Sequence, residues 1–133
     1  MTKKRILLID DEEDFCFFVK ANLENTGDFE VTTATRGKEG IELAQKEKPD
    51  LILLDILVPE MPGDEVAEIL LNNPETSKIP IVFLTAMVTK KEMGNEVIKE
   101  IGKQNFIAKP VTSEELADSI NRVLKKKRIK GCY

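Results

Sequence analysis

The sequence predicts an α/β fold in which a doubly wound, five-stranded parallel sheet lies between two layers of helices. Short continuous apolar runs alternate along the chain with longer segments whose apolar residues recur at helical spacing. Such apolar runs are typical of strands buried on both faces of a parallel sheet, and the intervening helices form right-handed crossovers. A chain of 133 residues is long enough for one domain with a substantial core. We therefore expect a three-layer (βα)5 sandwich.

Five short segments predict the strands because each is apolar or β-branched and is bounded by polar or turn-forming residues. In chain order they are residues 4–9, 30–35, 51–54, 79–84 and 104–108. The segments at 51–54 and 79–84 carry almost no polar side chain, as expected of central strands.

Five longer segments predict the helices. They begin in the acidic cluster after residue 9 and end near residue 24, then cover residues 38–46, 64–72, 90–102 and a segment that starts at Thr112. In the fourth helix, Val97, Ile98 and Ile101 are expected to face the core. The last helix begins with Thr112-Ser113-Glu114-Glu115, which combines a good N-cap with acidic residues in the first turn.

The first predicted helix has an apolar stripe and a further aromatic residue that does not belong to the stripe. The stripe at three- and four-residue spacing consists of Phe15, Phe18, Val19 and Leu23. Cys16 and Phe17 are then expected to point sideways or outward, next to the acidic cluster. Exposed aromatic residues often mark a contact surface, and partial burial against the last helix is the alternative.

Composition narrows the classes of function. The chain has no histidine, which excludes a Ser-His-Asp triad, a Cys-His pair and a His-ligated zinc site. A net charge of -4 gives no broad footprint for nucleic acid, and no apolar run approaches the length of a membrane span. Two cysteines are too few for a disulfide scaffold and indicate a reducing compartment. We expect a cytoplasmic protein without a direct nucleic-acid or membrane partner.

Polar residues suited to phosphate chemistry follow four of the predicted strands. They are Asp10-Asp11, Asp55, Thr85 and Lys109-Pro110. Ligands of open parallel sheets bind at the carboxyl ends of the strands, so these residues are expected to meet at one edge. Three carboxylates, a hydroxyl group and an ammonium group at one place indicate a site for a divalent metal and a phosphoryl group.

Each of these residues also has an ordinary structural explanation. An aspartate caps a helix well, but five successive acids from residue 10 to residue 14 repel one another, and a divalent cation would offset that cost. Asp55 has no helix to cap, because Pro59 and Pro62 follow it. A threonine at a strand end and a solvated lysine are common. It is their joint occurrence at four strand ends that favours a site.

These residues resemble the motifs of response-regulator receiver domains, which are the phosphoacceptor part of bacterial two-component signalling. The matching positions are Asp10-Asp11, Asp55 followed by Pro59 and Gly63, Thr85-Ala86, and residues 106–110 with Lys109 and Pro110. The resemblance implies a flavodoxin-like fold over residues 1–125. Residues 126–133 are then a basic C-terminal tail or a truncated linker.

The resemblance also implies a role for each residue. Asp55 is the expected phosphoacceptor. The expected ligands of Mg²⁺ or Mn²⁺ are Asp10, which acts mostly through water, Asp11, Asp55 and the backbone carbonyl of Leu57. Phosphoryl oxygens are expected to contact the Thr85 hydroxyl, the Ala86 backbone N–H and Lys109. Thr85 and Phe106 are the expected switch residues, and Gly63 is expected to adopt a positive φ.

The expected partners follow from the same resemblance. A histidine kinase or a histidine phosphotransfer protein would supply the phosphoryl group, and a downstream protein or a fused output domain would read it. The resemblance also allows a phosphorylation-dependent homodimer through the fourth helix, fifth strand and fifth helix. The domain is then a signalling receiver that catalyses only its own phosphorylation and dephosphorylation.

Three alternatives stay open on the sequence. An aspartyl-nucleophile phosphohydrolase usually carries a second acid two residues after its nucleophile, where this chain has Leu57. A flavodoxin-like electron carrier needs a phosphate-binding loop after its first strand, and the acidic residues 10–14 would repel phosphate there. A phosphorylation-independent scaffold would keep the fold without using the site.

Overall fold

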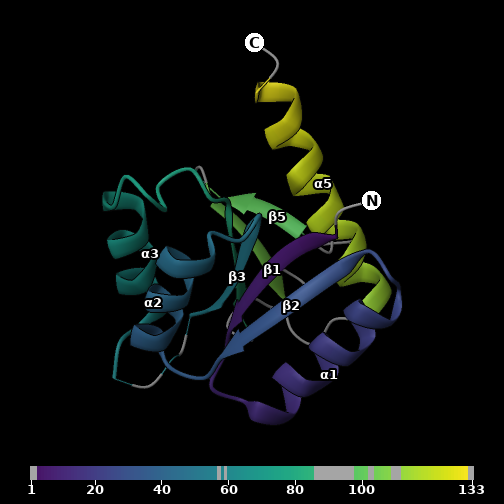
Figure 1. The fold of residues 1–133 in the computed structure, drawn as a ribbon, viewed down its shortest axis with the longest axis horizontal. Helices are drawn as coiled ribbons and strands as arrows, with labels where there is room; N and C mark the ends of the chain where they lie inside the picture. Colours follow the sequence, from purple (N-terminus) through teal and green to yellow (C-terminus); the bar gives the residue numbers. More distant parts are fainter. Residues whose placement is uncertain are drawn as a thin grey trace.

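The computed structural model describes residues 3–56, 58, 60–85, 98–101, 104–108 and 112–131, and its centre is a single twisted sheet (Figure 1). The strands are β1 (Lys4–Ile9), β2 (Phe29–Ala34), β3 (Leu51–Asp55), β4 (Ile81–Thr85), β5 (Ile98–Ile101) and β6 (Gln104–Ala108). The described helices are α1 (Glu13–Asn25), α2 (Gly37–Glu47), α3 (Gly63–Asn72) and α5 (Ser113–Gly131).

The strand order is β2-β1-β3-β4-β6-β5, and all neighbours except β5 and β6 run parallel. The predicted five-stranded parallel sheet is therefore confirmed in β1, β2, β3, β4 and β6. The order reverses at β1, because the chain first adds β2 on one side and then β3 on the other. In doubly wound sheets this reversal opens a crevice at the carboxyl ends of the strands, where ligands bind.

The register aligns these carboxyl ends. Ile9 at the end of β1 pairs with Leu54, and Asp55, the next residue of β3, pairs with Leu84. Thr85, the last residue of β4, pairs with Ala108. The residues that follow β1 and β3 are thereby brought to the same edge of the sheet.

Helices cover both faces of the sheet. In Figure 1, α1 and α5 lie on one side of the sheet and α2 and α3 on the other. Each pair covers its own hydrophobic cluster, one containing Leu8, Leu23 and Ile120 and the other containing Ile9, Ile52 and Leu70. Alternate residues of the central strands therefore enter opposite cores, which is why these strands are apolar throughout.

The structure corrects the prediction of a helix over residues 90–102. Residues 98–101 form β5, which pairs antiparallel with β6 from Ile98↔Ile107 to Ile101↔Gln104. The paired strands are only two residues apart in sequence, a spacing typical of a β-hairpin. Residues 90–97 lie outside the described part of the chain, as does the inward side chain predicted for Val97.

The face that α1 buries also differs from the predicted stripe. Cys16, Val19 and Leu23 are buried, whereas Phe18 is 47% exposed, so the predictions for Cys16 and Phe18 are wrong. Phe17 is 76% exposed, as expected, and Phe15 is partly buried against the core. The helix is therefore turned by about one residue from the predicted orientation.

The predicted start of the last helix is confirmed. The Thr112 side chain accepts a hydrogen bond from the Glu115 backbone N–H, and the Glu115 carboxylate accepts one from the Thr112 N–H, both at 3.1 Å. This reciprocal pair is a capping box. The helix continues to Gly131, so the first part of the basic tail has a helical backbone. No helix within the described ranges is both long enough and apolar enough to cross a membrane.

Candidate functional site

The structure brings together three of the acidic residues singled out by the sequence. Carboxylate oxygens of Asp10, Asp11 and Asp55 all lie within 4.8 Å of one another. Asp10 and Asp11 follow β1, and Asp55 ends β3, the adjacent strand. Oxygens that share one Mg²⁺ each lie about 2.1 Å from it, and therefore no more than about 4.2 Å apart. A small side-chain adjustment would thus let the three carboxylates meet one ion, and hard oxygen donors are the type this cation prefers.

The burial of this cluster supports the fit to a cation. Asp10 is 0% exposed and Asp55 is 7% exposed, whereas Asp11 faces solvent. Carboxylates that are buried next to one another lose hydration and repel each other, and a nearby cation offsets both costs. Asp11 is the member of the cluster that is exposed to solvent.

Hydrogen bonds of both its backbone and its side chain hold Asp10 in place. Its backbone N–H donates to the Ala34 carbonyl at 3.0 Å, which extends the pairing of β1 with β2. Its Oδ1 accepts a hydrogen bond from the Glu12 N–H at 2.9 Å, and its carbonyl accepts one from the Cys16 thiol at 3.3 Å. Glu12, not Asp10, is the N-cap residue of α1, so the Asp10 carboxylate bonds to the turn before the helix rather than capping it, and it belongs to the cluster.

The backbone around Asp55 is fixed by its neighbours on both sides. The Ile56 N–H donates to the Leu84 carbonyl at 3.3 Å, and the Ile56 carbonyl accepts a hydrogen bond from the Gly63 N–H at 2.8 Å. The positive φ predicted for Gly63 is wrong, because Gly63 begins α3 and Gly27 is the glycine with a positive φ in the described ranges. A glycine is needed at residue 63 for close approach to the backbone of Asp55 instead.

The remaining predicted site residues are only partly described. The backbone of Thr85 ends β4 opposite Ala108, which puts it at the same edge of the sheet as Asp55. Leu57, Ala86 and Lys109 lie outside the described residues, as does the side chain of Thr85.

Phe106 on β6 is half-buried and stacks on Phe83 of β4. Their ring centroids are 5.2 Å apart and the ring planes differ by 22°. The two residues are direct partners in the register of β4 and β6, so pairing the two apolar runs in the sequence would have found this contact. Phe106, the predicted switch residue, therefore packs against an aromatic neighbour, Phe83, that the sequence analysis missed.

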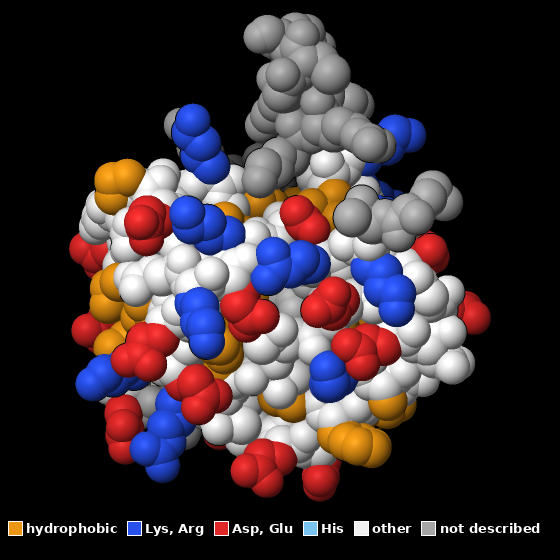
Figure 2. Space-filling view, in the orientation of Figure 1, with side chains coloured by type: hydrophobic (Ala, Val, Ile, Leu, Met, Phe, Trp, Pro, Cys, Tyr) orange, Lys and Arg blue, Asp and Glu red, His pale blue; other side chains and the backbone are white. Residues whose placement is uncertain are grey.

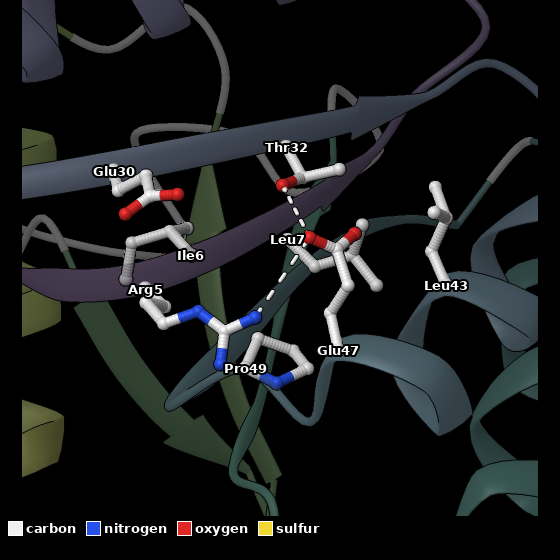
Figure 3. Close-up of a pocket in the computed structure, with 8 residues that line it drawn as sticks. All are labelled: Arg5, Ile6, Leu7, Glu30, Thr32, Leu43, Glu47 and Pro49. Carbon is white, nitrogen blue, oxygen red and sulfur yellow. Dashed lines mark hydrogen bonds and ion pairs between the residues drawn. The ribbon is translucent and has the colours of Figure 1, made fainter.

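Two other pockets are lined by both basic and acidic side chains. One has a volume of about 420 Å³, and its lining includes Arg36, Lys38, Glu39 and Glu42. Figure 3 shows a pocket between β1, β2 and the end of α2 whose volume is about 10 Å³, about that of one water molecule. Arg5 and Glu47 form an ion pair of 3.7 Å across it, and Thr32 donates to Glu47 at 3.5 Å. Acidic and basic side chains are interspersed on the face drawn in Figure 2.

Comparisons with known proteins agree on one family. A family model described as the response regulator receiver domain matches residues 6–121. Protein PilH of Pseudomonas aeruginosa is 37% identical over 121 residues, which make up 90% of this chain and 97% of PilH. The alkaline phosphatase synthesis transcriptional regulatory protein PhoP of Bacillus subtilis is 35% identical over 127 residues, which make up 95% of this chain and 50% of PhoP.

Solved structures give the same result. The chemotaxis response regulator CheY4 of Vibrio cholerae matches with a TM-score of 0.76 and 28% identity, covering 92% of this chain and 99% of CheY4. A response regulator from Desulfuromonas acetoxidans matches with a TM-score of 0.75 and 31% identity over 92% of this chain and 97% of its own. The chain therefore spans about half of PhoP and nearly the whole of PilH and CheY4.

Proposed function

Because this chain belongs to the response regulator receiver domain family, we propose that Asp55 accepts a phosphoryl group from a phosphohistidine on a partner protein. The partner is a histidine kinase or a histidine phosphotransfer protein, since this chain has no histidine of its own. The observation that carries the proposal is the convergence of the Asp10, Asp11 and Asp55 carboxylates at the carboxyl edge of the sheet.

The cation expected at this cluster is Mg²⁺ or Mn²⁺. Asp10, Asp11, Asp55 and the Leu57 carbonyl would hold it, and it would neutralise charge on the phosphoryl oxygens. Phosphoryl transfer depends more on position and charge than on covalent chemistry, so a rigid acidic cluster at a strand end suits it.

The role of Asp55 is that of a nucleophile. One of its carboxylate oxygens forms a bond to phosphorus while the bond between phosphorus and the partner's imidazole nitrogen breaks, and the nitrogen keeps the electron pair. The backbone hydrogen bonds of Ile56 fix the main chain directly after Asp55, which supports a constant position of its side chain. By resemblance to the family, the Thr85 hydroxyl, the Ala86 N–H and the Lys109 ammonium contact the other phosphoryl oxygens.

Phosphorylation then shifts the domain between two conformations. Thr85 moves toward the phosphoryl group, and Phe106 turns into the space that Thr85 leaves, at the cost of its stacking on Phe83. The change alters the surface formed by β6, α5 and the part of the chain that precedes β6. A downstream protein, a fused output domain or a second copy of the domain reads this surface, and we place the exchange in the cytoplasm.

The direct test is incubation with acetyl phosphate, with Mg²⁺ or with EDTA, followed by intact-mass measurement. A gain of one phosphoryl group in Mg²⁺ alone supports the proposal, and an unchanged mass contradicts it. Sustained hydrolysis of a phosphomonoester would instead favour the aspartyl phosphohydrolase. Normal binding of a downstream partner by Asp55→Asn would favour the phosphorylation-independent scaffold.

A further inference from the structure

The turn that joins β1 to α1 contains both Asp10 and Asp11, and Cys16 bonds to it twice. The Cys16 backbone N–H donates to the Glu12 carbonyl at 3.0 Å, which is the first hydrogen bond of the helix. The Cys16 thiol donates to the Asp10 carbonyl at 3.3 Å. One residue near the start of the helix therefore bonds both to the peptide group between the two acids and to the peptide group at which the helix begins.

The bond to the Asp10 carbonyl acts on the peptide group between the two acids. Rotation of that peptide changes ψ of Asp10 and φ of Asp11 together, so its orientation sets the direction of both side chains. The preceding peptide is already anchored by the Asp10 N–H bond to Ala34, and the following one by the Glu12 N–H bond to Asp10 Oδ1. The thiol supplies the anchor in the middle.

The thiol lies in apolar surroundings, where the loss of a hydrogen bond is costly. Cys16 is 4% exposed and belongs to the hydrophobic cluster that also contains Leu84 and Leu116. Asp10 is fully buried, so a carbonyl that loses the thiol has no ready access to water. A thiol is a weak donor, but in such a dry place its hydrogen bond limits how far the peptide can tilt.

We propose that Cys16 is a positioning residue for the acidic pair: its thiol, through the Asp10 carbonyl, holds Asp10 and Asp11 in the directions needed to bind the cation. This role rests on the proposed function, which supplies the cation. In this role Cys16 contacts neither the cation nor the phosphoryl group. The sequence pattern predicted that its side chain would point sideways or outward, whereas it is buried.

The test separates hydrogen bonding from packing with three substitutions. Cys16→Ser keeps a donor, Cys16→Val keeps a buried apolar side chain without a donor, and Cys16→Ala removes the donor without overpacking the core. Isothermal titration calorimetry measures the Mg²⁺ dissociation constant of each variant, and thermal unfolding without metal measures its stability. We expect Cys16→Val and Cys16→Ala to bind Mg²⁺ about three- to tenfold more weakly, and Cys16→Ser to stay within about twofold of the wild type.

A residue with only a packing role gives a different pattern. Its substitution lowers the metal-free melting temperature but leaves the Mg²⁺ dissociation constant unchanged, with Cys16→Val nearest to the wild type. That result, or Mg²⁺ binding by Cys16→Ser as weak as that of Cys16→Val, overturns the positioning role while the proposed function stands. If the wild-type protein gives no heat of Mg²⁺ binding, the proposed metal site fails, and the role of Cys16 fails with it.

Discussion

Gly63 at the start of α3 packs against the backbone of Asp55 at the end of β3. A Cβ atom on residue 63 would lie 2.4 Å from the Asp55 carbonyl oxygen and 2.8 Å from the Ile56 Cα, closer than a side chain can approach a backbone atom. Together with the hydrogen bond from the Gly63 N–H to the Ile56 carbonyl, this contact ties the first residue of a helix to the proposed phosphoacceptor.

Gly63→Ala is therefore expected to disturb the site and the fold together. The added methyl group must push α3 away from Asp55 and Ile56, and overpacking of this kind costs about 1–3 kcal/mol. We predict a lower free energy of unfolding in urea and slower phosphorylation by acetyl phosphate.

Gly40→Ala is the matched control. A Cβ there would also come within 2.4 Å of Cδ1 and 2.6 Å of Cγ1 of the buried Ile9, but these are side-chain atoms rather than backbone atoms, and alanine favours the helix. A loss of stability in Gly40→Ala as large as that in Gly63→Ala would contradict the importance of the backbone contact.

The acidic cluster should destabilise the protein when no metal is present. Replacing Asp11 or Asp10 with asparagine removes one of three neighbouring negative charges, so we predict a higher metal-free melting temperature. A ligand present at 100 times its dissociation constant stabilises a protein by about 2.7 kcal/mol, and both variants should lose most of this gain from Mg²⁺. Thermal unfolding with and without Mg²⁺ measures both effects.

Glu13→Gln is the control for this pair of variants. Glu13 is an exposed acid in the first turn of α1 and is not one of the three converging carboxylates, which belong to Asp10, Asp11 and Asp55. It should keep the full stabilisation by Mg²⁺. The metal site is contradicted if Asp11→Asn is stabilised by Mg²⁺ as strongly as Glu13→Gln.

Phe17 is the most exposed of the large apolar side chains on α1, and it lies six residues after Asp11 in the sequence. We predict that Phe17→Ala slows phosphotransfer from the cognate kinase, because an aromatic contact at a docking surface is lost. Phosphorylation by acetyl phosphate, which needs no docking, should keep its rate. The comparison requires both rates for the same protein preparation.

Leu71→Ala provides the corresponding control on the opposite side of the sheet. Leu71 is an exposed apolar residue of α3, and its loss should change neither rate. Equal slowing of both reactions by Phe17→Ala would show that the substitution damages the site rather than the docking surface.

Glu24 gives the fold a dependence on pH. The Val31 backbone N–H donates to its carboxylate at 3.0 Å and, with Lys20 at 3.0 Å, holds the pKa of Glu24 below its usual value of 4.5. A depressed pKa means that the charged form stabilises the fold above about pH 4.5, and that this contribution is lost as the pH falls through the lower folded pKa.

Glu24→Gln should reveal this contribution. At pH 7 the free energy of unfolding in urea should be about 0.5 kcal/mol lower for the variant than for the wild type. The difference is small because the carboxylate is partly solvated. The difference should shrink as the pH falls below about 4.5 and vanish in strong acid. A difference that is the same at pH 7 and pH 3 would contradict a role for the charge.

The convergence of Asp10, Asp11 and Asp55 was predictable because each residue directly follows or ends an apolar strand, and parallel strands bring their carboxyl ends to one edge. The buried face of α1 was not predictable from the sequence. Residues 15–19 are five consecutive apolar residues, so periodicity alone does not fix the rotation of the helix. Tertiary contacts fix it instead, among them the hydrogen bond from Cys16 to Asp10.

The prediction of a helix at residues 98–101 was wrong for a related reason. Ile98 and Ile101 fit the spacing of a helical face, yet so short a segment also fits a strand, and pairing with the open edge of β6 decides between them. Gly63 was correctly singled out but for the wrong reason, because a sequence does not distinguish a glycine needed for its φ from one needed for close approach.

The most direct test of the account is to locate the phosphoryl group after reaction with acetyl phosphate and Mg²⁺. Peptide mapping by mass spectrometry should find it on Asp55, and Asp55→Asn should acquire none while retaining its fold. Modification of another residue in the wild-type protein, or undiminished labelling of Asp55→Asn, would contradict the assignment of Asp55 as the phosphoacceptor.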